Sequence, residues 1–173
     1  MDPLSIRTQL LSLAEQHGVR ILWACESGSR AWGFASPDSD YDGRFLFIHP
    51  HSAYLSPWQP LDEIRADLPG DLDFSGWDFA KALRLGAKSN SSLLEWLQSP
   101  IVYEQAPRFR DALFAAVAET FRPREGLRNY LGISRAAARN FLPDGRIKIK
   151  KLFYILRPLL AAKWIVETGA IPP

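Results

Sequence analysis

The sequence is poor in the residues that make disulfides and zinc sites. Cys25 is the only cysteine among 173 residues, so no disulfide can form within the chain. Because Cys25 lies in an apolar run, we expect it to be buried and to act as a small hydrophobic residue. His49 and His51 have no cysteine or further acidic residue nearby, so a zinc site is not expected there.

Signals for secretion and membrane insertion are also missing. The first residues do not combine a positively charged segment with a following apolar one, which argues against a signal peptide. The most apolar late run, residues 152–162, contains Arg157 and Pro158, which argues against a membrane span. The single cysteine favours a reducing compartment. Together these absences predict a cytoplasmic protein that has no membrane partner.

The residues that are present indicate a globular protein with an uneven charge distribution. Hydrophobic residues make up 47% and charged residues 23%, and 173 residues suffice for one sizeable core, alone or with a smaller appended part. Residues 1–104 hold 8 Lys and Arg against 14 Asp and Glu, whereas residues 105–173 hold 13 against 5. This division suits a metal-dependent enzyme that acts on polyphosphate or nucleic acid. The alternative is a basic helical surface that is only solvated.

The residues with chemical potential concentrate between positions 21 and 49. Residues 21–25 are continuously apolar and lead into a polar, glycine-containing turn, which predicts a buried strand and a turn. A second strand is predicted over residues 44–48, shortly after Asp40 and Asp42. Residues two apart on a strand project to the same face. Two such carboxylates repel each other unless a cation lies between them, so the pair predicts a divalent metal, best matched by Mg²⁺.

The turn after the first strand offers a place for phosphate. Gly28 allows backbone N–H groups to approach a ligand closely, the Ser29 hydroxyl adds a donor, and Arg30 adds a positive charge. Each half of the motif alone is ordinary turn chemistry, since Asp and Ser in residues 36–40 bond readily to their own backbone. Their combination between two apolar runs predicts a nucleotide site in which the metal bridges the phosphates.

A Gly-Ser dipeptide followed after ten residues by Asp-x-Asp resembles the active site of the DNA polymerase beta superfamily of nucleotidyltransferases. Over most of the chain, four blocks resemble the predicted nucleotidyltransferases of the RNA-repair-associated polymerase-beta-like family: ESGSRAWGFASPDSDYD, DFSGWDFAKAL, NSSLLEWLQSPIVY and KKLFYILRPLLAAKWI. The resemblance implies that Gly28, Ser29 and Arg30 bind the triphosphate of an NTP. It also implies that Asp40 and Asp42 are catalytic and hold two Mg²⁺ ions, for which Mn²⁺ can substitute.

A third carboxylate is expected on a neighbouring strand, because the superfamily uses one to complete the metal site and to help deprotonate the attacking hydroxyl. Strands are predicted over residues 61–68 and 71–77, joined by a Pro-Gly turn. The second block of the resemblance implies that Asp73 is this catalytic metal ligand, and Asp71 remains the alternative. We expect Asp78 to cap the helix that follows.

Helices are predicted from apolar periodicity over residues 4–17, 79–88, 92–98, 107–119, 124–141 and 146–167. Ser92 and Glu95 have the spacing of a capping box. The resemblance also makes Asn90 and Glu95 candidates for residues that support the site, while capping is a sufficient alternative reason for Glu95.

The last predicted helix carries further candidates for nucleotide binding. At 100° per residue, Lys150, Tyr154 and Arg157 fall within about 60° of one another. Lys151 can also reach a phosphate. Similar helical residues contact the triphosphate or base in related nucleotidyltransferases, so we expect these four residues to bind nucleotide.

The sequence therefore predicts an α+β nucleotidyltransferase fold, with a mixed twisted sheet flanked by helices and a helical C-terminal part. Residues 1–121 are expected to form the catalytic domain and residues 122–173 the helical region. Members of the resembling family often continue further, which leaves open whether the chain is truncated. The predicted reaction transfers a nucleoside monophosphate from an NTP, ATP among the candidates, to a hydroxyl acceptor, with pyrophosphate as the leaving group.

The acceptor and two other classes of function stay open at this point. RNA is suggested by the family resemblance and by four arginines at four- and seven-residue steps, which return to nearly the same helical face: Arg124, Arg128, Arg135 and Arg139. A protein-modifying or antitoxin-like nucleotidyltransferase would instead use a side-chain hydroxyl. The third possibility is a nucleic-acid-binding module that has lost catalysis.

Overall fold

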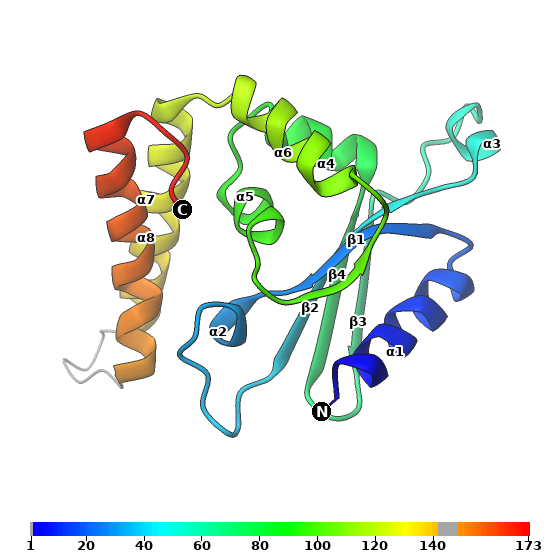
Figure 1. Cartoon of the computed structure of the whole chain (residues 1–173), viewed down its shortest axis with the longest axis horizontal. Coiled ribbons are helices and arrows are strands. Elements are labelled where there is room, and N and C mark those ends of the chain that lie inside the picture. The colour runs from blue at the N-terminus through cyan, green and yellow to red at the C-terminus, as the bar shows by residue number, and fades with distance from the viewer. Residues whose placement is uncertain (1, 142–148) are drawn as a thin grey trace. The chain divides into compact units, whose positions relative to one another are not determined.

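Five strands form one mixed sheet in the computed structural model, which describes residues 2–141 and 149–173 (Figure 1). Their order across the sheet is β3-β4-β2-β1-β5. Strands β2 and β4 are parallel, and the other neighbouring pairs are antiparallel. The strands are β1 Arg20–Glu26, β2 Tyr41–Ile48, β3 Glu63–Leu68, β4 Leu72–Asp78 and β5 Val102–Gln105. The four longer strands confirm the prediction, whereas the short, half-exposed β5 was not predicted.

The helices account for most of the remaining described residues. They are α1 Pro3–Gln16, α2 Gly28–Ala31, α3 His51–Tyr54, α4 Phe79–Gly86, α5 Ser91–Leu97, α6 Phe109–Glu119, α7 Pro123–Phe141 and α8 Ile149–Thr168. Every predicted helix is present with ends shifted by a few residues, and residues 146–148 of the last one lie outside the described part. The predicted polar turn is a single helical turn, α2. In the described residues, no helix is both long and apolar enough to cross a membrane.

The chain divides into two compact units. The first comprises Met1–Arg84 with Glu95–Phe114, and the second comprises Leu85–Leu94 with Ala115–Pro173. The second unit thus contains the whole of the predicted helical region together with two segments of the predicted catalytic region. The α+β class with a helical C-terminal part is confirmed.

The hydrophobic core of the first unit lies on one face of its sheet. Helix α1 covers one face (Figure 1), where Ile6 and Leu10 join Phe45 and Phe74 in a buried cluster. Side chains alternate along a strand, so the residues between these core positions project to the opposite face. Cys25 of β1 is fully buried, as predicted, and burial raises the pKa of its thiol to about 12.

Two helix starts test the capping predictions. Asp78 caps α4 as expected, because the Ala80 N–H donates to Asp78 Oδ1 at 2.9 Å. The prediction of a capping box that starts at Ser92 is wrong. Helix α5 begins at Ser91, and the cap is Asn90, whose Oδ1 accepts from the Leu93 N–H at 3.0 Å. The sequence offered two polar residues with N-cap chemistry, and the chain enters the helix at the earlier one.

In the second unit, α7 and α8 pack along each other. Tyr130, Ala162 and Ile165 form their buried cluster, and the buried Ser134 hydroxyl donates to the Ile155 carbonyl at 3.1 Å. These contacts fix which face of α7 is buried. The remaining face carries the arginines considered below.

Candidate active site

The turn after β1 approaches β2 so closely that only glycine fits. Gly28 has a φ of +59°, and a Cβ added there would lie 2.0 Å from Asp42 Oδ2. A positive φ and the close approach both require glycine. The carboxylate of Asp42 therefore packs against the Gly28 backbone. Ser29, the next residue, is buried, and its carbonyl accepts a hydrogen bond from Phe34.

The backbone of Asp42 is fixed to the end of β1. Its carbonyl accepts from the Ser27 N–H at 2.8 Å, and its own N–H donates to Glu26 Oε1 at 2.8 Å. Both bonds join the Gly-Ser turn to the Asp-x-Asp segment. Two parts of the motif that are separate in sequence thus lie together in the structure.

Glu26 is a buried carboxyl beneath this junction. It is inaccessible to solvent, and its Oε2 accepts a short hydrogen bond from the Tyr103 hydroxyl of β5. Burial raises the pKa of Glu26 above the ordinary value of a glutamate, because the charged form loses its hydration. Glu26 was not among the residues predicted to form the site. The signal available was an acidic residue ending an otherwise apolar strand.

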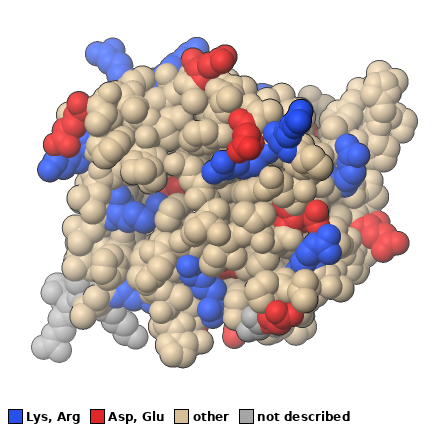
Figure 2. Space-filling view, in the orientation of Figure 1, with Lys and Arg blue, Asp and Glu red and all other residues tan. Residues whose placement is uncertain are grey.

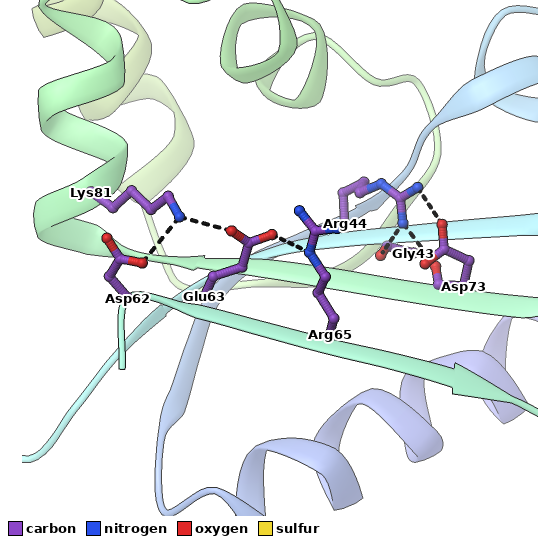
Figure 3. Close-up of polar contacts among 7 residues, drawn as sticks. All are labelled: Gly43, Arg44, Asp62, Glu63, Arg65, Asp73 and Lys81. Atoms are coloured by element: carbon purple, nitrogen blue, oxygen red, sulfur yellow. Dashed lines mark hydrogen bonds and ion pairs between the residues drawn. The ribbon is translucent and has the colours of Figure 1, made fainter. Parts of the chain in front are cut away.

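Asp42 and Asp73 face each other across the two parallel strands. The register pairs Asp42 of β2 with Asp73 of β4. Arg44 links them, since its Nη2 donates to Asp42 Oδ1 at 2.8 Å and to Asp73 Oδ2 at 2.7 Å. Figure 3 shows Arg44 reaching Asp73. Asp67 of β3 pairs with Asp73 from the other side, so three aspartates lie in one row across three strands.

Arg44 was not predicted as part of the site. Its Nη1 donates to the Gly43 carbonyl at 3.2 Å and to the Asp73 carbonyl at 2.9 Å, and the side chain is 16% exposed. Its spacing in the sequence could have indicated this role, because an arginine two residues after Asp42 projects to the same face of the strand.

The other two predicted carboxylates have different surroundings. Asp40 is exposed and lies just before β2 begins. Asp71 has a φ of +58° between β3 and β4, and its carbonyl accepts from the Tyr41 N–H at 2.8 Å. Of the two candidates for the third carboxylate, Asp73 is the one that stands beside Asp42. Its role as a ligand stays a prediction.

Arg30 contacts the loop that leads to Asp42. Its Nη2 donates to the Ser39 carbonyl at 2.6 Å, and its Nε donates to the Asp40 carbonyl at 3.1 Å. The guanidinium also lies 3.8 Å from the centre of the Tyr41 ring. These contacts hold the loop against α2. Binding of phosphate by Arg30 stays a prediction.

A second group of ion pairs lies on the neighbouring edge of the sheet. Lys81 Nζ donates to Asp62 at 3.1 Å and to Glu63 at 2.9 Å, and Arg65 also donates to Glu63 (Figure 3). The hydrogen bond from Lys81 lowers the pKa of Glu63. Because these charges are paired with one another across β3 and α4, we assign them to the stability of the sheet edge.

The predicted helical ligands belong to the second unit. Lys150, Tyr154 and Arg157 are half-buried on α8 and Lys151 is exposed there. Their binding of nucleotide stays a prediction.

The arginine stripe of α7 is accessible to solvent. Its four members, Arg124, Arg128, Arg135 and Arg139, are all exposed. Arg128 also pairs with Glu125 at 3.1 Å. On the face drawn in Figure 2, uncharged atoms separate the Lys and Arg side chains over α7 and α8.

Asp42 and Asp73 suit a divalent cation in type and direction. They offer hard oxygen ligands, which Mg²⁺ and Mn²⁺ prefer, and they already converge on a cationic nitrogen. Among residues 2–141 and 149–173, no three His, Cys, Asp or Glu side chains gather closely enough to hold a metal ion. The pair would thus provide two ligands, and others would come from water or a bound triphosphate, or from Asp40 if its side chain moved toward the pair.

Comparison with known proteins identifies a family and similar proteins. The model of the RNA repair pathway DNA polymerase beta family matches residues 4–173. The protein YcgL of Bacillus subtilis (strain 168), described as uncharacterized, is 44% identical over 165 residues, which are 95% of this chain. This chain spans 64% of the length of YcgL. A crystal structure of a nucleotidyltransferase-like protein from Exiguobacterium sibiricum 255-15 aligns with 97% of this chain and 59% of its own, at 11% identity and a TM-score of 0.43.

Proposed function

The chain belongs to the RNA repair pathway DNA polymerase beta family, and we propose that it is a metal-dependent nucleotidyltransferase. The proposed reaction transfers a nucleoside monophosphate from an NTP to a hydroxyl acceptor. One observation carries the proposal. The carboxylate of Asp42 packs on Gly28 of the Gly-Ser turn and lies beside Asp73, so the residues that we propose as metal ligands adjoin the turn that we propose binds phosphate.

The proposed bond changes follow the chemistry of phosphoryl transfer. The acceptor oxygen forms a bond to the α-phosphorus, the bond between the α-phosphorus and its bridging oxygen breaks, and pyrophosphate leaves. Mg²⁺ held by Asp42 and Asp73, with Asp40 as a further ligand, would supply charge that stabilises the attacking and leaving oxygens. The protein mostly positions the reactants and neutralises charge in such reactions.

Individual residues have separate proposed tasks. The backbone at Gly28 binds the triphosphate, because glycine lets N–H groups approach it closely. The hydroxyl of Ser29, which is buried in the protein without ligand, would join this contact once it became accessible. Asp73 accepts the proton of the acceptor hydroxyl. Its side chain is 46% exposed, which is compatible with contact to a substrate from solution. Arg30 orders the loop that carries Asp40 through its two bonds to backbone carbonyls.

RNA is the acceptor class that we propose. It is supported by the description of the family and by the exposed arginines on α7, which can follow a phosphate backbone. A side-chain hydroxyl of a protein is the competing acceptor. Incubation with an α-labelled NTP, Mg²⁺ and either RNA or protein acceptors distinguishes the two by where the label appears.

The first experiment is a screen of the four NTPs for thermal stabilisation in the presence and absence of Mg²⁺. A ligand that binds only the folded state raises the melting temperature by mass action. We expect at least one NTP to stabilise the protein only with Mg²⁺. RNA binding without any Mg²⁺-dependent effect of an NTP would favour a binding module that has lost catalysis.

Asp42→Asn is the variant that tests catalysis. It keeps the shape of the side chain but removes the charge that a metal requires, so labelled nucleotide transfer should fall at least about a hundredfold. Asp67→Asn is the matched control, because Asp67 lies in the same row but further from the Gly28 turn. Transfer by Asp42→Asn at the wild-type rate would show that the site is wrongly assigned.

A further inference from the structure

Arg44 occupies the space between two carboxylates that the proposed reaction needs for metal. A single nitrogen, Nη2, lies 2.8 Å from Asp42 Oδ1 and 2.7 Å from Asp73 Oδ2. Hydrogen bonds between an arginine and carboxylates are charge-assisted and are stronger than neutral ones. A divalent ion that bridged the same two oxygens would need the position of this nitrogen.

The two cations cannot share this position. Mg²⁺ binds carboxylate oxygen at roughly 2.0–2.1 Å and requires near-octahedral geometry, which leaves no room for a guanidinium nitrogen between the same oxygens. Like charges at such short range also repel.

The other two hydrogen bonds of Arg44 do not involve carboxylates. Nη1 donates to the carbonyls of Gly43 and Asp73, which are backbone groups and not proposed metal ligands. A cation bound to the carboxylates would leave these two bonds intact. The guanidinium can thus release the carboxylates of Asp42 and Asp73 while Nη1 stays bound to the backbone of β2 and β4.

We propose that Arg44 competes with divalent metal for the carboxylates of Asp42 and Asp73, and that metal binds there only when Nη2 of Arg44 releases them. This inference rests on the proposed metal-dependent function. In the protein without metal, Arg44 neutralises the repulsion between the two carboxylates. Arg44 therefore lowers the affinity of the free protein for metal, and a substrate that brings additional ligands, such as a triphosphate, shifts the competition toward metal.

The test is a titration of the full chain with Mn²⁺ alone, in which free Mn²⁺ is measured by electron paramagnetic resonance. Arg44→Gln removes the competing charge and keeps a polar side chain. Because two charge-assisted hydrogen bonds no longer have to be displaced, the Kd for Mn²⁺ should fall about tenfold or more. Poor folding weakens a site, so it cannot imitate this result.

Arg65→Gln provides the matched control. Arg65 and Arg44 both pair in register with Ser75, one from each strand beside β4, but Arg65 forms its ion pair with Glu63. The control removes the same charge from the same sheet and thus measures the general electrostatic effect. We expect its Kd to change less than about threefold, since exposed charges are strongly screened.

Two further variants make every outcome decisive. Arg44→Lys replaces Arg44→Gln in the test if Arg44→Gln does not fold. One ammonium group cannot make all four contacts of the guanidinium, so the Kd of Arg44→Lys for Mn²⁺ should also lie below that of the wild type. A Kd for both Arg44 variants that equals or exceeds the wild-type value overturns the competition. If Asp42→Asn still abolishes Mn²⁺ binding in that case, the proposed function survives. If Asp42→Asn binds Mn²⁺ as the wild type does, or no protein binds it, the metal site and the competition both fall.

Discussion

At the scale of single residues, Asp42 is held through its backbone and through both of its carboxylate oxygens. Its backbone bonds to Ser27 and Glu26, one carboxylate oxygen contacts Arg44, and the other packs on Gly28. Such a residue has little freedom to adopt another orientation. Preorganised groups of this kind are what charge stabilisation in a reaction requires, because no reorganisation is needed when the charge develops.

Glu26 should make the stability of the protein depend on pH. Its pKa in the folded state is raised above 4.5 by burial, so the folded state holds this proton more tightly than the unfolded state. The stability that protonated Glu26 provides is present below pH 4.5 and is lost as the pH rises through the folded-state pKa. Glu26→Gln stays neutral, so the free energy of unfolding of the wild type relative to this variant should fall as the pH rises.

Urea denaturation of both proteins at pH 4.5 and pH 7.5 measures this difference. Glu104→Gln is the control, since Glu104 lies at the surface and pairs with the exposed Arg7. A difference between wild type and Glu26→Gln that does not change with pH would contradict the account of Glu26.

At the scale of elements, the sequence allowed the four longer strands and the Gly-Ser turn to be predicted from local patterns, whereas β5 was missed. The apolar run before Gly28 and the alternation around Asp73 are such patterns, and both strands are present. The pairing of Asp42 with Asp73 could not be predicted in the same way. It depends on β2 and β4 being parallel neighbours in one register, which is a property of contacts between distant parts of the chain.

The two site residues that were not predicted were missed for the same physical reason. Arg44 and Glu26 acquire their importance from partners on other strands, Asp73 and Tyr103. An isolated charged residue in an apolar strand signals that a partner must exist, because an unpaired buried charge is costly. The signal does not identify the partner.

The turn at Gly28 should not tolerate alanine. Gly28→Ala combines a positive φ with a methyl group 2.0 Å from Asp42 Oδ2. We expect a loss of about 2–4 kcal/mol in the free energy of unfolding, and loss of stabilisation by Mg²⁺ and NTP, because Asp42 must move.

Gly33→Ala separates the clash from the backbone strain. Gly33 has a φ of +75°, but no atom outside its immediate neighbours lies within 4 Å of an added Cβ. This variant should lose only about 1–2 kcal/mol from backbone strain and keep the stabilisation by Mg²⁺ and NTP. Equal losses in both variants, measured by urea denaturation and thermal shift, would mean that the contact with Asp42 is unimportant.

The start of α5 gives a second test at this scale. Asn90→Ala removes the side chain that accepts from the Leu93 N–H, so the free energy of unfolding should fall by about 1 kcal/mol. Ser92→Ala, at the position favoured by the capping-box pattern, should change it by less than about 0.5 kcal/mol. The reverse order in urea denaturation would restore Ser92 as the cap.

At the scale of the whole molecule, charge is distributed unevenly along the chain. Acidic residues dominate up to position 104, and basic residues dominate after it. The prediction of an exposed arginine stripe on α7 is confirmed for all four positions, since helical periodicity is a local property. Periodicity does not identify the molecule that the stripe binds, so a binding experiment must identify it.

The double variant Arg128→Ala/Arg135→Ala tests RNA as the acceptor. If both side chains contact phosphates, RNA affinity should fall and the slope of log affinity against log salt should decrease by about 1.5–2. Arg20→Ala/Arg65→Ala removes the same charge from exposed positions outside α7 and is the control. Filter binding at several salt concentrations provides both slopes. Unchanged RNA binding in the α7 variant, or an equal change in the control, would remove the stripe as an RNA contact.

Asp42, Asp73 and the Gly28 turn are proposed to form one metal and nucleotide site. A crystal structure with Mn²⁺ and a non-hydrolysable NTP would show whether they do, because manganese is located by its anomalous scattering. We expect a manganese peak at roughly 2.0–2.4 Å from carboxylate oxygens of both Asp42 and Asp73, with the triphosphate against the backbone of Gly28 and Ser29. Manganese and nucleotide bound elsewhere, for example at His49 and His51, with Arg44 still between Asp42 and Asp73, would contradict this proposal.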